Sequence, residues 1–146
     1  RYAAAGTAYH LPNVSLLCWD NTHKVSGGPV IPLEVMQAGS AAARAMGLAV
    51  HLDGARLWNA VAASGVDAAA YAACADSVMF CFSKGLGAPV GSMLAGSADF
   101  ISTARQTRSR LGGAMRQVGV IAAAARIALE GRARVFDDHI TANRLA

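Results

Sequence analysis

Short, unbroken apolar runs recur along the chain and predict the strands of a sheet. The first run ends at Cys18, the second leads from Leu48 into the carboxylate of Asp53, and the third ends directly before Lys84. Runs that are apolar on both alternating faces are typical of strands in a parallel sheet that is covered on both sides. We therefore expect strands at Val14–Cys18, Leu48–Asp53, Ser77–Ser83 and Gly91–Ala95.

The segments between these runs have the spacing of helices. Pro32 precedes the first of them and Gly47 follows it, which gives that helix a favourable start and a favourable cap. Alternating strands and helices predict an α/β fold with a mostly parallel sheet flanked by helices, in one domain. The residues after Glu130, among them His139, are interpreted as a polar tail without an evident role. The expected helices are Leu33–Met46, Ala55–Ser64, Asp67–Ala75, Ser97–Arg110 and Ala114–Glu130.

Composition excludes several classes of protein. Hydrophobic residues make up 54% of the 146 residues and charged residues 15%, which excludes a disordered chain. Every apolar run ends before about 18 residues, so a membrane span is not expected. The net charge is +4, but the arginines are mostly scattered and only 6% of residues are aromatic, so a nucleic-acid partner is not expected. The cysteines Cys18, Cys74 and Cys81 are far apart, which favours reduced thiols in the cytoplasm over disulfides or a metal site.

Two polar residues stand where predicted strands end. Asp53 closes the second strand and Lys84 follows the third, and ligands bind at the carboxyl ends of strands in open α/β sheets. The alternative is that Asp53 and Lys84 form a salt bridge or simply face water, as most Asp and Lys residues do. Each residue is followed by a glycine, however, and Lys84 is one of two lysines beside eleven arginines. A primary amine forms imines, so the pair indicates pyridoxal phosphate chemistry, in which an acid keeps the pyridine nitrogen protonated.

Four runs around these residues closely resemble the low-specificity L-threonine aldolases. They are Asp20–Glu34, His51–Asn59, Phe82–Ser92 and Leu111–Gln117, and they agree with the family in order and spacing. Asp20 replaces the glutamate that is more usual there, which is a mild departure. The resemblance implies a fold-type I, aspartate-aminotransferase-like enzyme of the beta-eliminating lyase group. Residues 1–146 would form part of its large, cofactor-binding domain, and we expect the chain to begin partway into a longer protein.

The resemblance implies roles for individual residues. Lys84 forms the Schiff base with pyridoxal phosphate, and Asp53 pairs with the pyridine nitrogen. Arg56 reaches the substrate carboxylate or the cofactor ring oxygen, with an exposed arginine at a helix start as the alternative. Arg116 reaches a cofactor phosphate across a subunit boundary, and a salt bridge on a helix surface is the alternative. Ser83 contacts the phosphate or simply caps the turn.

Three further polar residues precede the second strand. His10 matches a family histidine near the substrate hydroxyl group, and as a catalytic base it takes the proton of that group. The alternative is a lone histidine without a role. Asn21 and His23 are interpreted as groups that order a loop.

Together these residues predict a lyase that cleaves L-threonine or another β-hydroxy-α-amino acid to glycine and an aldehyde. The alternatives are a related beta-eliminating lyase, a phenylserine aldolase, an amino-acid racemase, or a non-catalytic module derived from one of them. Pyridoxal 5'-phosphate is the expected cofactor and an amino acid the expected substrate. The resemblance also implies a homodimer or homotetramer with sites shared between subunits. Because family site residues lie outside this segment, we expect the 146 residues alone to be inactive.

Overall fold

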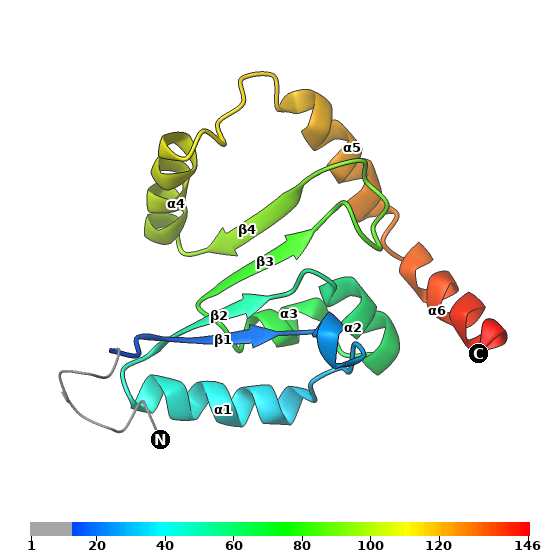
Figure 1. Ribbon diagram of the computed structural model, residues 1–146, viewed down its shortest axis with the longest axis horizontal. Coiled ribbons are helices and arrows are strands. Elements are labelled where there is room, and N and C mark those ends of the chain that lie inside the picture. The colour runs from blue at the N-terminus through cyan, green and yellow to red at the C-terminus, as the bar shows by residue number, and fades with distance from the viewer. Residues whose placement is uncertain (1–12) are drawn as a thin grey trace.

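The computed structural model describes residues 13–146 and contains every strand and helix that the sequence predicts, with shifted ends (Figure 1). His10 lies outside the described residues. None of the helices in the described part of the chain is long and apolar enough to cross a bilayer. In chain order the elements are β1 (Leu16–Asp20), the 3-10 helix η1 (Lys24–Ser26), α1 (Leu33–Ala45), β2 (Ala49–Asp53), α2 (Leu57–Ser64), α3 (Ala68–Ala72), β3 (Ser77–Cys81), β4 (Ser92–Gly96), α4 (Ala98–Arg110), α5 (Gly119–Glu130) and α6 (Arg134–Leu145).

The four strands form a mixed sheet in the order β1-β2-β3-β4. The strands β1, β2 and β3 are parallel, and β4 runs antiparallel to β3. A parallel return needs a crossover of a dozen or more residues, whereas residues 82–91 between β3 and β4 contain no helix. The chain therefore comes back antiparallel. The predicted α/β fold with a mostly parallel sheet is confirmed.

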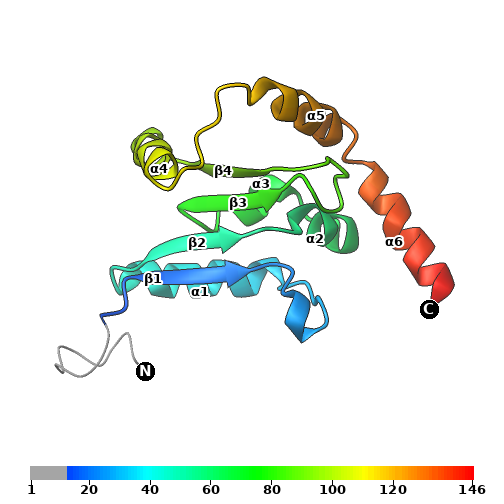
Figure 2. The ribbon, with the colours of Figure 1, turned by 45° about the horizontal axis from the view of Figure 1, so that its top comes forward.

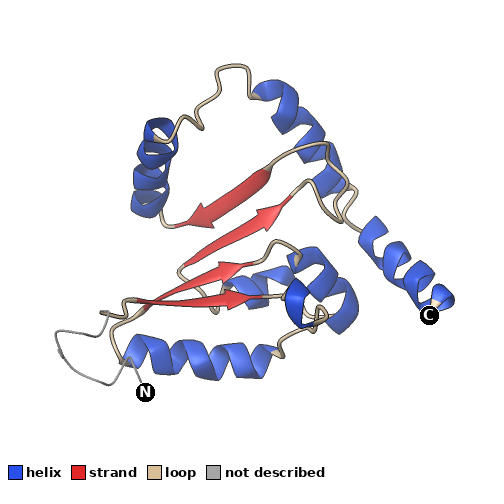
Figure 3. Cartoon of the chain, in the orientation of Figure 1, coloured by secondary structure: helices blue, strands red, loops and turns tan. Residues whose placement is uncertain are grey.

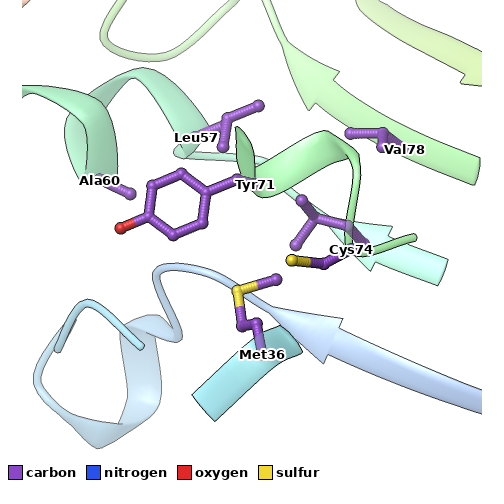
Figure 4. Close-up of a cluster of buried hydrophobic side chains, with 7 residues drawn as sticks. Met36, Leu57, Ala60, Tyr71, Cys74 and Val78 are labelled. Atoms are coloured by element: carbon purple, nitrogen blue, oxygen red, sulfur yellow. The ribbon is translucent and has the colours of Figure 1, made fainter. Parts of the chain in front are cut away.

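One core lies between the parallel strands and the helices α1, α2 and α3 (Figure 2). Leu52 of β2, Met36 of α1 and Tyr71 of α3 are fully buried in it, and Figure 4 shows Met36 and Tyr71 facing the same interior. Trp19 of β1 packs against this core and donates a hydrogen bond from Nε1 to Ser40 Oγ at 2.9 Å. These contacts hold α1 against the sheet.

A second core joins the segment after β3 to the C-terminal helices. Phe82 and Leu86 of that segment are buried against Ala125 and Ala128 of α5 and Val135 of α6. Figure 3 shows both helices beside the turn that links β3 to β4. The turn that carries Lys84 is therefore held by helices that come later in the chain.

Two segments differ most from the sequence prediction. Helix α5 begins at Gly119 rather than Ala114, because residues 113–115 have no regular secondary structure and residues 116–118 form a turn. The interpretation of the C-terminal residues as a polar tail is wrong, since Arg134–Leu145 forms α6. Val135 and His139 lie four residues apart on one face of α6. Packing of this face against α2 stabilises a segment with little apolar signal.

Asp76 ties the start of β3 to β2 and α1. Its Oδ2 accepts the backbone N–H of Val50 at 2.7 Å, and its Oδ1 accepts a hydrogen bond from Arg44 at 3.0 Å. The hydrogen bond from Val50 first, and then that from Arg44, holds the pKa of Asp76 below its usual value. The cysteines are free, and burial raises the pKa of the Cys74 thiol.

Replacing Val50 with alanine tests the packing of β2. Val50→Ala is expected to lower the free energy of unfolding by about 2 kcal/mol, because it removes two buried methyl groups and leaves a cavity. Val25 is 89% exposed, so the control Val25→Ala is expected to change the stability by less than about 0.5 kcal/mol. Urea unfolding followed by circular dichroism measures both. Equal losses would contradict the packing described for β2.

The hydrogen bonds of Asp76 predict a pH dependence of stability. Because folding lowers the pKa of this carboxyl group, its contribution is present above the unfolded value of about 4 and is lost as the pH falls through the lower folded value. Asp76→Asn is expected to cost about 1 kcal/mol at pH 7 and progressively less below about pH 4. Urea midpoints across this range measure the difference. Asp138→Asn, at an exposed position of α6, is the control, and a pH-independent cost for Asp76→Asn would refute the prediction.

Candidate active site

The carboxyl ends of β1, β2 and β3 lie along one edge of the sheet. Asp20 at the end of β1 is in register with Asp53 at the end of β2, and Asp53 is in register with Met79 of β3. Because these strands are parallel, the chain leaves all of them at the same edge (Figure 1). Lys84 follows Cys81, the last residue of β3, by three residues. The strand topology thus brings Asp53 and Lys84 to the same edge, as the sequence predicts.

Asp53 is held in place by hydrogen bonds from several directions. The backbone N–H of Asn21 donates to the Asp53 carbonyl oxygen at 3.0 Å, and the N–H of Gly54 donates to the Met79 carbonyl oxygen at 2.8 Å. The side-chain Oδ1 of Asp53 accepts the N–H of Ala55 at 3.0 Å. A methyl group on Gly54 would lie 2.9 Å from the Met79 oxygen, so this close approach requires glycine. The carboxylate is therefore half-buried and fixed in orientation, while Oδ2 accepts no hydrogen bond from the described residues.

Lys84 stands on a turn whose two sides are anchored. Phe82 and Leu86 are buried in the second core, and the N–H of Gly87 donates to the Lys84 carbonyl oxygen at 2.8 Å. Lys84 itself is exposed and forms no ion pair within residues 13–146. The alternative of a salt bridge between Asp53 and Lys84 is thus not formed in this structure. The amine remains available for a ligand.

Arg56 and Ser83 flank these two residues. Arg56 is the N-cap residue of α2 and lies three positions after Asp53. Its half-buried side chain pairs with no carboxylate in the described part of the chain, so the guanidinium can receive an anion. The hydroxyl group of Ser83 donates to the Gly91 carbonyl oxygen at 3.4 Å. Of the two roles predicted for Ser83, phosphate contact and turn capping, this contact is the second.

Arg116 lies apart from this edge. It belongs to the connection between α4 and α5, beyond β4 in the sheet order (Figure 1). The alternative of a salt bridge on a helix surface is wrong, because Arg116 is in a turn and pairs with no acid in residues 13–146. The same connection and the start of α5 expose apolar side chains, namely Leu111, Met115, Val118 and Val120.

The loop after β1 is ordered by its polar side chains. Asn21 is completely buried, and its Oδ1 accepts the backbone N–H of Ile31 at 3.1 Å. His23 contacts the hydroxyl group of Ser26 and lies 3.9 Å from the carboxylate of Asp20. The prediction that Asn21 and His23 order a loop is confirmed.

Sequence reasoning missed a polar contact near the turn that carries Lys84. Asn59 Nδ2 lies 3.2 Å from Nε2 of His139, a residue 80 positions later in the chain. Asn59 also lies against Gly85, since a methyl group on Gly85 would be 2.9 Å from Asn59 Oδ1. The one sequence signal for this contact is the glycine that directly follows Lys84.

The edge gathers three chemically different groups, on Lys84, Asp53 and Arg56. An exposed amine attacks carbonyl groups, a carboxylate stabilises a protonated ring nitrogen, and a guanidinium binds carboxylate or phosphate through paired hydrogen bonds. Residues 13–146 contain no group of three or more His, Cys, Asp or Glu residues that could hold a metal ion. The donor set of this edge therefore suits an organic ligand with a carbonyl group, a ring nitrogen and an anionic group.

Comparisons with known proteins agree in sequence and in fold. The chain is 46% identical over 136 residues to the low-specificity L-threonine aldolase 1 of Arabidopsis thaliana, covering 92% of this chain and 38% of that protein. It is 42% identical over 138 residues to the low specificity L-threonine aldolase of Escherichia coli K12, covering 94% and 40%. A crystal structure from Listeria monocytogenes, provisionally named an L-allo-threonine aldolase, matches with TM-score 0.79 and 27% identity over 90% of this chain and 36% of that one.

These matches cover nearly all of this chain but a minor part of each relative. The chain spans about two fifths of the length of the curated relatives that it matches. The model of the beta-eliminating lyase family matches residues 1–146. The resemblance inferred from the four sequence runs is confirmed at the level of the family, and the chain belongs to the beta-eliminating lyases.

Proposed function

We propose that this protein is a pyridoxal 5'-phosphate-dependent lyase that cleaves L-threonine and other β-hydroxy-α-amino acids to glycine and an aldehyde. The observation that carries the proposal is the placement of Asp53 and Lys84 at the same carboxyl edge of adjacent parallel strands. Relatives that bear the name L-threonine aldolase are 42% to 46% identical to most of this chain, which supports the substrate class. Bound pyridoxal phosphate supplies a carbonyl group for the amine and a ring that accepts electrons from the substrate.

The residues at this edge fit that cofactor. The Lys84 amine is exposed and has no ion-pair partner among the described residues, so it is available to form an imine. Asp53 offers a fixed carboxylate with one oxygen free of hydrogen bonds from residues 13–146. Gly54 and Gly85 follow these two residues, and because they have no side chain they do not obstruct a ligand.

Each residue then has a defined task in the cleavage. Lys84 would hold the cofactor through its side-chain amine and would release the product. Asp53 keeps the ring nitrogen protonated, which makes the ring a stronger electron acceptor. Arg56 holds the substrate carboxylate, because its guanidinium is unpaired within the described chain and stands three residues from Asp53. His10, outside the described residues, takes the proton from the β-hydroxyl group.

Arg116 completes the proposed site by binding the cofactor phosphate. The position of Arg116 beyond β4 supports a role at the site of a partner subunit, in a homodimer or homotetramer. Exposed apolar side chains flank Arg116 on the same connection, which supports an interface there. Free cysteines suit the cytoplasm, which we propose as the location.

Substitution of Lys84 tests the proposal most directly. In the full-length protein loaded with pyridoxal phosphate, Lys84→Ala is expected to abolish the absorbance band of the cofactor imine and to lower kcat by at least about 1,000-fold, since it removes the amine that forms the imine. Arg56→Lys is the control, because it leaves the imine band in place. Product analysis with threonine, phenylserine and alanine separates the aldolase from related lyases and racemases. An imine band that survives in Lys84→Ala would reject the proposal.

A second prediction concerns the charge of Asp53. Asp53→Asn keeps the shape of the side chain and an oxygen that accepts the Ala55 N–H, but it removes the negative charge. We expect kcat to fall by about 100-fold, which is typical when one electrostatic partner of a reacting system is removed. The imine band is expected to remain. Steady-state kinetics with threonine measure the loss, and Asp20→Asn on the neighbouring strand is the matched control. Equal kinetics in the two variants would count against the role of Asp53.

A further inference from the structure

We propose that Asn59 and helix α6 position the turn that carries Lys84, with His139 orienting the Asn59 side chain. The inference rests on the proposed function of Lys84 and adds residues to which the sequence assigns no role. Asn59 is the third residue of α2, and His139 lies on α6. Both act through the backbone of the turn, so they are positioning residues.

The contact between Asn59 and the turn is close. A methyl group on Gly85 would lie 2.9 Å from Asn59 Oδ1 and 3.5 Å from both Cγ and Nδ2, so the carboxamide lies against the Gly85 backbone. A Cβ atom at Gly85 would displace it. The glycine after Lys84 therefore has a packing reason in addition to the access that it gives a ligand.

The hydrogen bonds of the turn leave a gap at this place. On the side towards β4, the N–H groups of Phe82 and Ser83 both donate to the Gly91 carbonyl oxygen. The N–H groups of Lys84 and Gly85 donate to no backbone carbonyl oxygen in the described part of the chain. Side-chain packing against Asn59 therefore restrains the turn where backbone hydrogen bonds do not.

His139 decides which end of the Asn59 carboxamide faces Gly85. A carboxamide has a donor end and an acceptor end. With Nδ2 donating to the unprotonated Nε2 of His139 at 3.2 Å, Oδ1 is the atom turned to Gly85. His139 and the buried Val135 are one helical turn apart, so the packing of α6 fixes the imidazole.

Helix α6 also reaches the same turn without Asn59. Arg134 Nη2 donates to the Leu86 carbonyl oxygen at 3.5 Å, and Val135 is buried with Leu86 and Phe82 in the second core. Helix α6 thus contacts Leu86 of the turn directly. It reaches Gly85 of the same turn through Asn59. Such support restricts the positions that a reactive amine samples, and small displacements of reacting groups are costly for catalysis.

Substitutions at the two positioning residues test the inference in the full-length protein. Asn59→Ala and His139→Phe are each expected to slow formation of the imine with added pyridoxal phosphate by about threefold to tenfold. This factor corresponds to the net free energy that one hydrogen bond contributes. Both are also expected to shift the midpoint of the pH titration of the imine absorbance. His139→Gln supplies an acceptor oxygen on a flexible side chain and is expected to restore at least half of the rate.

Substitution of glycine supplies a readout that does not need the cofactor. Gly85→Ala is expected to lower the urea midpoint of the apoprotein because its Cβ meets Asn59 Oδ1. The control is Gly119→Ala, where no heavy atom lies within 4 Å of the added Cβ. Because the Gly85 and Asn59 substitutions disturb the same contact, the double variant is expected to lose less than the sum of the single losses.

The outcomes separate this inference from the proposed function. No imine band in the wild-type protein, or a band retained in Lys84→Ala, would overturn the proposed function and this inference with it. A normal band that Asn59→Ala and His139→Phe leave unchanged in rate and pH midpoint would overturn the positioning role alone. Additive losses for Gly85→Ala and Asn59→Ala would likewise refute the contact. Slowed imine formation, rescue by His139→Gln and non-additive losses together support it.

Discussion

The parallel pairing of β2 with β3 is the constraint on which the candidate site depends. Because the two strands run in the same direction and Asp53 is in register with Met79, the residues that follow each strand emerge at one edge. An antiparallel arrangement of the same strands would send Asp53 and Lys84 to opposite edges. Hydrogen bonds across the strand ends, from Asn21 and Gly54, then fix the end of β2 between its two neighbours.

The two candidate site residues, Asp53 and Lys84, are held in different ways. Asp53 ends a strand with neighbours on both sides, and its own side chain caps the following turn through Ala55. Lys84 lies beyond the end of its strand, so sheet hydrogen bonds cannot position it. Packing supplies the restraint instead, through Phe82 and Leu86 against α5 and α6. A fixed carboxylate and an exposed amine on a packed turn suit a ring held at one end and covalently bound at the other.

The C-terminal helices therefore matter to the site although they lie far from it in sequence. Helix α6 is rich in polar residues. Its amphipathic face is recognised only from the contacts that Val135 and His139 make with earlier segments of the chain. Through its contacts with Leu86 and Asn59, α6 helps to hold the β3–β4 turn in place. Such division of a site between distant segments is common where a sheet supplies the reactive groups and helices supply their rigidity.

The sequence by itself determined the strands, most of the helices and the two residues at the strand ends, because apolar runs, prolines and glycines act locally. Tertiary structure alone decided the direction of β4, the existence of α6, the turn around Arg116 and the pairing of Asn59 with His139 across 80 residues. These features depend on which surfaces meet after the chain has folded. Neither hydrophobic periodicity nor a local motif records such contacts between distant segments.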